Sequence, residues 1–309
     1  MSALSGVEAV GAVAVALVID LSAGDPPNRF HPVAGMGRLL ASGHRWLGAG
    51  SRAWLLTTGA LLVLGVAGLA GAAGWSVGLL AARLGPAGLV LEGLALTTLL
   101  SVRGLVAAAR EVGGALARGD LADARASVGF HLVSRSTDAL SESQVASAAV
   151  ESVAENLTDS LVAPVLYYFV LGLPGAAMYR AINTADAMLG YRTGPLEHFG
   201  KASARLDDVL NLLPARIAAL AIVLAAGRTC REAWRVLARD HGRTASPNAG
   251  WTMAAMAGAL GVTLTKPGVY RLGDGRAPGV EHVDRSVRIM WRAAALALGA
   301  LGVVRIAFS

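Results

Sequence analysis

Three carboxylates at four-residue spacing, Glu151, Glu155 and Asp159, stand directly before an apolar segment. Because steps of four residues keep side chains on one face of a helix, they predict an acidic stripe that enters a bilayer. A carboxylate at the hydrocarbon centre costs about 2.5–3.5 kcal/mol, so such groups usually meet cations, metals or water. The stripe and the neighbouring Asn156 are therefore a candidate site. The alternative is a solvated amphipathic face.

A second acidic motif, Asp207-Asp208-x-x-Asn211, predicts two carboxylates and an amide on one helical surface. Hard oxygen ligands in this arrangement suit Mg²⁺ that carries phosphate oxygens, which makes the three residues candidate metal ligands. Cationic side chains flank the motif and are candidates for holding the same phosphates. They are Lys201, Arg205 and Arg216. The alternative is that the two aspartates only cap a helix starting near residue 209.

Further polar residues stand in three other stretches of the chain. Those singled out as candidates are Asp25, Asn28 and His31 in a Gly/Pro-rich loop, Asn183 and Asp186 after an apolar run, and Asn248 in Ser246-Pro247-Asn248-Ala-Gly250-Trp251. For His31, a structural histidine before proline is the alternative to a ligand. No Gly-x-x-x-x-Gly-Lys-Ser/Thr motif occurs, so a bound nucleotide would not be held by an ordinary P-loop.

The composition is that of an integral membrane protein. The 309 residues are 54% hydrophobic and 16% charged, against about 25% charged in soluble domains. The apolar residues are mostly Ala, Leu, Val and Gly, and 38 glycines suit closely packed helices, so we expect an all-α polytopic bundle. The net charge of +6 comes from arginines at the ends of apolar segments, a pattern that indicates membrane orientation rather than a nucleic-acid partner.

Apolar runs mark the helices that position these residues. The runs are 3–21, 53–82, 86–109, 160–178, 209–227 and 286–308. Because Pro164, Gly172 and Pro174 interrupt the run 160–178, we expect a broken or re-entrant segment there. Arginines at three- or four-residue intervals in 228–241 predict an amphipathic helix on the cytoplasmic membrane surface, with a solvated face as the alternative. Residues 110–158 form a polar helical subregion within one catalytic domain, 1–309.

The arginine distribution also predicts an orientation. The loop 22–52 and the region after residue 109 are rich in arginine, whereas the turn 83–86 holds only Arg83. Both rich regions should therefore face the cytoplasm, and the N-terminus should lie outside as a retained helix. If all the polar groups meet on the side that holds ATP, 160–178 cannot be a simple crossing.

These motifs together resemble the adenosylcobinamide-phosphate synthase family of cobalamin biosynthesis. The resemblance follows the family's order over almost the whole chain. The stretches that carry it are Gly24 to Gly37, Glu151 to Pro164, Asn183 to Tyr191, Phe199 to Arg216 and Ser246 to Trp251. The chain departs from the family pattern at Arg192 to His198 and at Thr265-Lys266.

The resemblance implies an enzyme of the cytoplasmic (inner) membrane, with its active site facing the cytoplasm. It implies an ATP- and Mg²⁺-dependent ligation that joins adenosylcobyric acid to (R)-1-aminopropan-2-ol phosphate, or to aminopropanol, through an acyl phosphate. Metal ligands would then be Asp207, Asp208 and Asn211, and catalytic residues Glu151, Glu155, Asp159, Lys201 and Arg205. Residues binding ATP or substrate would be Asp25, Asn28, His31, Asn156, Asn183, Asp186, Arg216 and Asn248.

Other functions and partners stay open on the sequence alone. Intramembrane acids and broken helices are also typical of a membrane transporter or sensor. A Mg²⁺-diphosphate lipid enzyme would explain the Asp-Asp-x-x-Asn motif and none of the others. Besides the corrinoid, the aminoalcohol and the lipid bilayer, partners to consider are a second copy of the chain and other cobalamin-assembly membrane enzymes.

Overall fold

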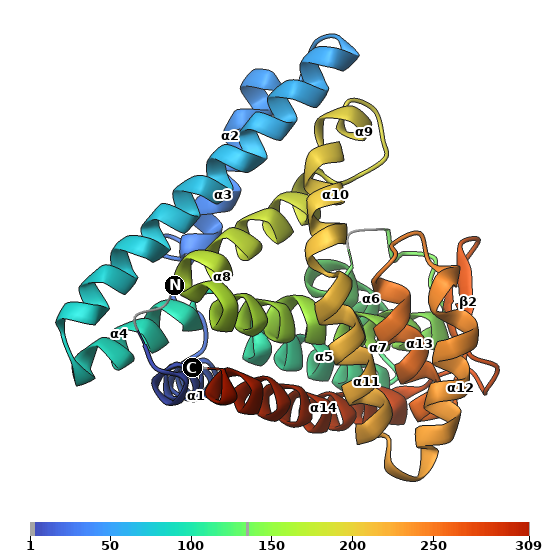
Figure 1. Ribbon diagram of the computed structural model, residues 1–309. Helices are drawn as coiled ribbons and strands as arrows, with labels where there is room; N and C mark the ends of the chain where they lie inside the picture. The colour runs from blue at the N-terminus through green and yellow to red at the C-terminus, as the bar shows by residue number, and fades with distance from the viewer. Residues whose placement is uncertain (1–3, 134–135, 309) are drawn as a thin grey trace. The chain divides into compact units, whose positions relative to one another are not determined.

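The computed structural model covers residues 1–309 and describes residues 4–133 and 136–308. The chain forms two compact units. Unit 1 comprises residues 1–101, 163–211 and 301–309, and unit 2 comprises residues 102–162 and 212–300. The prediction of an all-α polytopic membrane protein is confirmed (Figure 1). The prediction of one catalytic domain over 1–309 stays a prediction.

Unit 1 is built from long apolar helices and short connecting ones. Its elements are α1 (Gly6–Ser22), α2 (Pro32–Leu47), α3 (Arg52–Arg83), α4 (Pro86–Thr97), α8 (Ala163–Leu189), α9 (Leu196–Phe199), α10 (Lys201–Leu210) and the end of α14 (Val280–Ala307). Serine side chains start two of the helices: Ser5 caps α1 in a capping box with Glu8, and Ser51 caps α3. Large side chains such as Leu61, Leu69 and Trp75 stay exposed on α3, as expected where lipid covers a helix.

Unit 2 packs its helices around α13 (Ala249–Leu260) and carries a small hairpin. Its elements are α5 (Val102–Ala117), α6 (Leu121–His131), α7 (Glu142–Leu157), a π-helix (Thr158–Val162), α11 (Leu212–Ala225), α12 (Cys230–Asp240), α13 (Ala249–Leu260), β1 (Leu264–Lys266), β2 (Tyr270–Leu272), most of α14 and two 3₁₀ turns, Gly227–Thr229 and His241–Arg243. Strands β1 and β2 are antiparallel, with Leu264 opposite Leu272. Helix α13 is buried along nearly its whole length, which makes it the centre of the unit's core.

Four helical stretches of the described residues are long and apolar enough to cross a membrane: Arg52–Arg83, Pro86–Ala117, Glu142–Leu189 and Val280–Ala307. A fifth is added if α10 and α11, which break at Asn211, count as one span. The predicted run 53–82 is confirmed almost residue for residue. The last span begins six residues before the predicted 286, and α1, with 17 residues, is not among these candidates.

The predicted break in 160–178 is confirmed at Gly172. Helix α8 contains non-helical backbone there, with φ 69° and ψ −162°, two residues before Pro174. A positive φ is readily adopted only by glycine, and the proline removes a backbone donor from the next turn. The chain therefore breaks at the residue that tolerates the conformation, within an otherwise helical span.

Glycines let helices of unit 1 approach closely. A Cβ atom on Gly74 of α3 would lie 2.8 Å from the backbone of Leu173 in α8, and one on Gly59 would lie 1.9 Å from the carbonyl oxygen of Phe199 in α9. Backbone atoms cannot move aside cheaply, so these positions require glycine. In a bilayer the hydrophobic effect does not drive helices together, so the close van der Waals packing that small residues allow contributes more to their association.

We expect Gly59→Ala to lower the stability of the protein by about 1–3 kcal/mol, because the methyl group would overlap the Phe199 carbonyl. Gly65→Ala on the same helix is the matched control, since no atom lies within 4 Å of its Cβ position. That control should be neutral or stabilising by up to about 1 kcal/mol. Thermal unfolding in detergent measures both. Equal melting temperatures for the two variants would contradict the packing argument.

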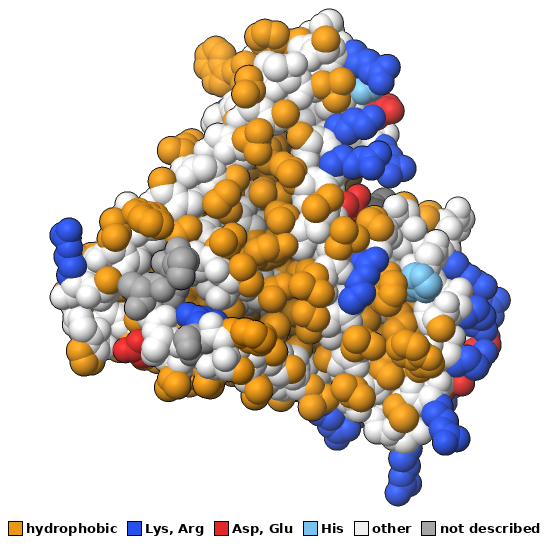
Figure 2. All heavy atoms as spheres, viewed as in Figure 1, with side chains coloured by type: hydrophobic (Ala, Val, Ile, Leu, Met, Phe, Trp, Pro, Cys, Tyr) orange, Lys and Arg blue, Asp and Glu red, His pale blue; other side chains and the backbone are white. Residues whose placement is uncertain are grey.

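Helix α12 is the predicted amphipathic helix, and it buries one side while exposing Trp234 and its arginines. In Figure 2, Lys and Arg side chains gather over the region of α12. Two of these arginines form ion pairs with Asp274, which follows strand β2. Arg239 binds Asp240 and Asp274, and Arg235 binds Asp274 at 2.9 Å. The position predicted for α12, on the membrane surface, stays a prediction.

Candidate functional site

Asp207 is the centre of a hydrogen-bonded cluster in unit 1. One of its carboxylate oxygens accepts a hydrogen bond from the Asn183 amide at 3.1 Å, and the other accepts one from the Asn211 amide at 3.0 Å. The Asn211 amide oxygen in turn accepts a hydrogen bond from the Tyr179 hydroxyl at 3.0 Å. The structure thus brings together three of the predicted site residues, which come from α8 and the end of α10.

Two tyrosines support this cluster. Tyr167 and Tyr179 stack with their ring centroids 5.2 Å apart, and the Tyr167 hydroxyl donates to the Leu210 carbonyl at 2.8 Å. The Leu210 carbonyl belongs to the end of α10, where the helix leaves backbone acceptors unpaired. Neither tyrosine was among the predicted site residues. Tyr167 lies inside the apolar run 160–178 and Tyr179 directly follows it. That position was the only sequence signal, because a buried tyrosine hydroxyl requires a partner.

The position of the aspartates in their helix excludes the capping alternative. Helix α10 spans Lys201–Leu210, so Asp207 and Asp208 lie in its last turn, and α11 begins only at Leu212. The carboxyl end of a helix carries partial negative charge, which disfavours carboxylates. Two acidic groups at an electrostatically unfavourable end indicate a requirement other than helix stability.

The carboxylates of Asp207 and Asp208 are hard oxygen donors, a type that suits a Mg²⁺ ion that also binds phosphate oxygens. Both functional groups of the Asn211 amide are already engaged, its NH₂ by Asp207 and its oxygen by Tyr179. These contacts orient Asn211 as a support for the Asp207 carboxylate. Among the described residues, no group of three or more His, Cys, Asp and Glu side chains is arranged to hold a metal by itself. The metal roles of Asp207, Asp208 and Asn211 stay predictions.

Glu151 is the centre of a second cluster, in unit 2. Its side chain is only 5% exposed, and its two oxygens accept hydrogen bonds from the Ser147 hydroxyl at 2.8 Å and the Tyr270 hydroxyl at 2.9 Å. The Ser147 oxygen also accepts the backbone N–H of Thr265 at 2.7 Å. Burial of Glu151 argues against the solvated-face alternative at this position. Ser147 and Tyr270 were not among the predicted site residues.

The rest of the acidic stripe is less buried. Glu155 lies half-buried on α7, and Asp159 lies half-buried in the π-helix that follows. Asn156 makes contacts within its own segment, donating to the Ser152 carbonyl at 3.0 Å and accepting from the Ser160 hydroxyl at 3.3 Å. Because the π-helix changes the residue spacing, the regular four-residue stripe does not extend unchanged to Asp159.

The Gly/Pro-rich loop joins two predicted residues in unit 1. His31 caps α2, its Nδ1 accepting from the Val33 N–H at 3.2 Å, and its Nε2 lies 3.4 Å from Asp25. The Ser101 hydroxyl donates to the other Asp25 oxygen at 3.5 Å. Arg38 donates to the backbone carbonyl of Asn28 at 3.2 Å, so the predicted use of the Asn28 side chain stays a prediction. Capping gives His31 a structural role.

A cation–amide pair lies in unit 2. Arg216 of α11 donates to the Asn248 side-chain oxygen at 2.6 Å and to the Pro247 carbonyl at 3.3 Å. Its guanidinium also stands over the Trp251 ring, 4.5 Å from the centroid. These contacts fix the guanidinium plane, as a site for a planar anionic group requires. The sequence had grouped Asn248 and Trp251 but placed Arg216 with the Asp207 motif.

Three further predicted residues lie on α10 and α8. Lys201 and Arg205 are exposed and, four residues apart on α10, lie on one face of that helix. Asp186 is half-buried on α8, beside Gly190, where a Cβ atom would lie 2.0 Å from its carboxylate oxygen. The predicted clusters lie in different units, and their convergence on a single site stays a prediction.

Comparison with known proteins gives one consistent family. The model of a family described as CobD/Cbib protein matches residues 13–295. "Probable cobalamin biosynthesis protein CobD" of Methanothermobacter thermautotrophicus is 44% identical over 270 residues, which cover 86% of this chain and 87% of the relative. "Cobalamin biosynthesis protein CbiB" of Salmonella typhimurium is 38% identical over 311 residues, 96% of this chain and 97% of the relative. No solved structure matches the chain.

Proposed function

This chain belongs to the CobD/Cbib protein family, and from that premise we propose that it is an ATP-dependent amide ligase of cobalamin biosynthesis. The substrates we propose are adenosylcobyric acid and (R)-1-aminopropan-2-ol phosphate, and the product is adenosylcobinamide phosphate. Support for a role in cobalamin biosynthesis comes from the names of relatives that cover most of the chain. The family match includes Glu151, Asp207 and all the other candidate residues.

The proposed chemistry proceeds in two balanced steps. The free propionate of the corrinoid attacks the γ-phosphorus of ATP, so that ADP leaves and an acyl phosphate forms. The amine then attacks the acyl carbon, inorganic phosphate leaves, and the nitrogen gives up one proton to a base. Stabilisation of charge on the transferred phosphoryl group is mainly electrostatic, and Mg²⁺ enters with ATP as part of that substrate.

The observation that carries the proposal is the Asp207 carboxylate, held by two amides in the last turn of α10. Amide donors fix the direction of the carboxylate and leave each oxygen with a further lone pair. We propose that Asp207 and Asp208 bind the Mg²⁺ of ATP, and that Lys201 and Arg205 hold its phosphates. Asn183 and Asn211 act by positioning Asp207.

The location of the enzyme is part of the proposal. Its long apolar helices make it a multi-pass membrane protein. We propose the cytoplasmic membrane, with the active site on the side that holds ATP, as the arginine distribution favours. The names of the relatives as biosynthesis proteins favour the enzyme over a transporter or sensor.

Incubation of the purified protein with adenosylcobyric acid, Mg²⁺-ATP and aminopropanol phosphate tests the proposal. Formation of the amide, detected as a new corrinoid by mass spectrometry together with stoichiometric ADP, is expected. A parallel reaction with unphosphorylated aminopropanol identifies the amine substrate. Amide formation without ATP consumption, or ATP hydrolysis with no corrinoid product at any amine, would overturn the assignment.

We expect Glu151→Gln to lower kcat by ~10²-fold if this carboxylate serves the reaction as a base or anionic ligand. Tyr270→Phe removes one hydroxyl that orients Glu151 and should cost about tenfold. Because both act through one group, the double variant should be no worse than Glu151→Gln alone. The matched control is Glu142→Gln, an exposed glutamate at the start of the same helix. Multiplicative losses in the double variant would contradict the coupling.

A further inference from the structure

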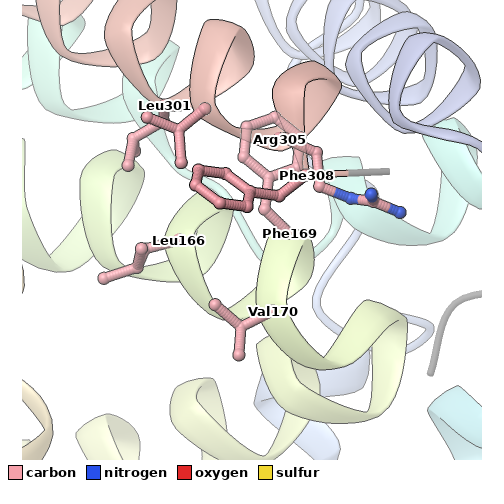
Figure 3. A pocket seen from close by; sticks show the side chains of 7 residues that line it. Leu166, Phe169, Val170, Leu301, Arg305 and Phe308 are labelled. Carbon is pink, nitrogen blue, oxygen red and sulfur yellow. The ribbon is translucent and has the colours of Figure 1, made fainter.

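A pocket of about 350 Å³ lies in unit 1, and no residue of the carboxylate clusters lines it. Its walls come from one face of each of two helices. Leu166, Phe169 and Val170 are spaced i, i+3, i+4 and so lie on one face of α8. The lining residues at and just after the end of α14 are spaced i, i+3, i+4, i+7 and also share one face. Those of α14 are Leu301, Val304 and Arg305, and Phe308 follows the last residue of the helix. Figure 3 shows Leu301 and Phe308 opposite Leu166 and Val170, with the Arg305 guanidinium extending to one side.

The walls are apolar and open towards the surroundings of the protein. Val170 is 61% exposed and Val304 is 54% exposed, although both are large apolar side chains. Arg305 lies in the last turn of the candidate span Val280–Ala307. Arginines at the ends of membrane spans lie at the depth of the lipid headgroups. The pocket therefore combines apolar walls with a cation in the last turn of a candidate span.

The arginine has donor capacity that the described residues do not use. Its Nη2 donates to the Leu4 carbonyl at 3.0 Å, whereas its buried Nε has no hydrogen-bond partner in the described part of the chain. No carboxylate of the described residues forms an ion pair with it. Glu92, a buried carboxylate of α4, is instead bound by the Tyr168 hydroxyl. The buried Nε is closed to a ligand, but the outer N–H groups of a guanidinium donate well to a phosphate oxygen.

We propose that this pocket binds an anionic phospholipid. The lipid phosphate accepts hydrogen bonds from the Arg305 guanidinium, and the first part of one acyl chain lies between α8 and the end of α14. The rest of the lipid stays in the bilayer, because the pocket is too small for a whole molecule. Anionic headgroups bind basic residues at membrane surfaces by charge, and the apolar walls add the specificity for a chain.

Native mass spectrometry of the purified protein, with added dioleoylphosphatidylglycerol or dioleoylphosphatidylcholine, tests the proposal. The wild type should retain phosphatidylglycerol in preference, and Arg305→Gln should lower that binding roughly tenfold, the weight of one charge-assisted contact. Arg83→Gln is the matched control, since Arg83 is also a basic residue in the last turn of an apolar span. It should bind as the wild type does.

A second variant separates loss of the site from loss of folding. Val170→Trp fills the pocket while Arg305 is retained, so binding should fall although the melting temperature of the free protein does not. A third arm replaces the lipid by inorganic phosphate and should give no thermal shift. Equal loss in Arg305→Gln and Arg83→Gln, equal binding of the two lipids, or stabilisation by phosphate alone would each overturn the proposal.

Discussion

Replacement of Asp207 by asparagine is expected to lower the rate of amide ligation by ~10²–10³-fold, the cost of removing one preorganised group from a phosphoryl-transfer site. The variant keeps the size of the side chain, but its one oxygen can accept from only one of the Asn183 and Asn211 amides, which now donate to separate oxygens. The loss therefore combines the missing charge with one lost hydrogen bond. The measurement is the steady-state rate of product formation at varied Mg²⁺ and ATP.

Two further variants complete this test: one is a control, and the other removes the support of the Asp207 carboxylate. Asp284→Asn changes an exposed helical aspartate outside every cluster and should leave the rate unchanged. Asn211→Leu keeps the carboxylate but removes its support, so we expect a loss of about tenfold and a raised Mg²⁺ requirement. If Asp207→Asn retains full activity while it remains folded in detergent, Asp207 has no part in the site.

Asp240→Ala is expected to have the largest effect on stability, about 3 kcal/mol, because it leaves the buried Gly273 N–H without its acceptor and removes the carboxylate that pairs with Arg239 and Arg243. The Asp240 side chain is fully buried and binds Arg239 at 2.7 Å, Arg243 at 3.1 Å and the Gly273 N–H at 2.7 Å. Glu232→Gln on the same helix removes an exposed ion pair with Arg235 and should cost less than about 1 kcal/mol. Chemical unfolding in detergent distinguishes the two. Equal costs would show that burial of Asp240 is irrelevant.

The same network predicts a loss of stability in acid. Burial alone would raise the pKa of Asp240, but the hydrogen bonds from Arg239 and Gly273 outweigh it, and the pKa is lowered. Hydrogen bonds from Arg239 and Arg235 lower the pKa of Asp274 to about 2. A carboxylate whose pKa is lower in the folded state stabilises the folded protein at pH values above its unfolded-state pKa, near 4. This stabilisation disappears as the pH falls towards 2, because the carboxylate becomes protonated in both states. The melting temperature should fall over that window in the wild type and fall less in Asp240→Ala.

The sequence predicted the helices well because their signal is local. The run 53–82 has no polar interruption, and the structure makes it the helix Arg52–Arg83. The break in 160–178 was also predictable, since Gly172 and Pro174 restrict the backbone themselves. The boundary near 209 was wrong by a few residues. The apolar run begins at 209, whereas α10 continues to Leu210 and α11 begins only at Leu212.

The partners of the candidate residues could not be predicted, because they are distant in the chain. Glu151 is bound by Tyr270, 119 positions later, and Asn211 is bound by Tyr179. Single tyrosines in a chain of this composition carry no periodic signal, so only the packing of the elements identifies them. The acidic motifs themselves were detectable, because a carboxylate near an apolar run is costly wherever its partners lie.

The Ser147 hydroxyl links the helix α7 to the β1–β2 hairpin in a way that has a dynamic consequence. It accepts from the Thr265 N–H and donates to Glu151, so backbone amide, hydroxyl and carboxylate form one directional chain, in which each bond polarises the next. Neutralising Glu151 weakens the acceptor at the end of the chain. The amide of Thr265 should then exchange its hydrogen with solvent faster, which makes a single backbone position a reporter of the charge on a side chain 114 residues before it.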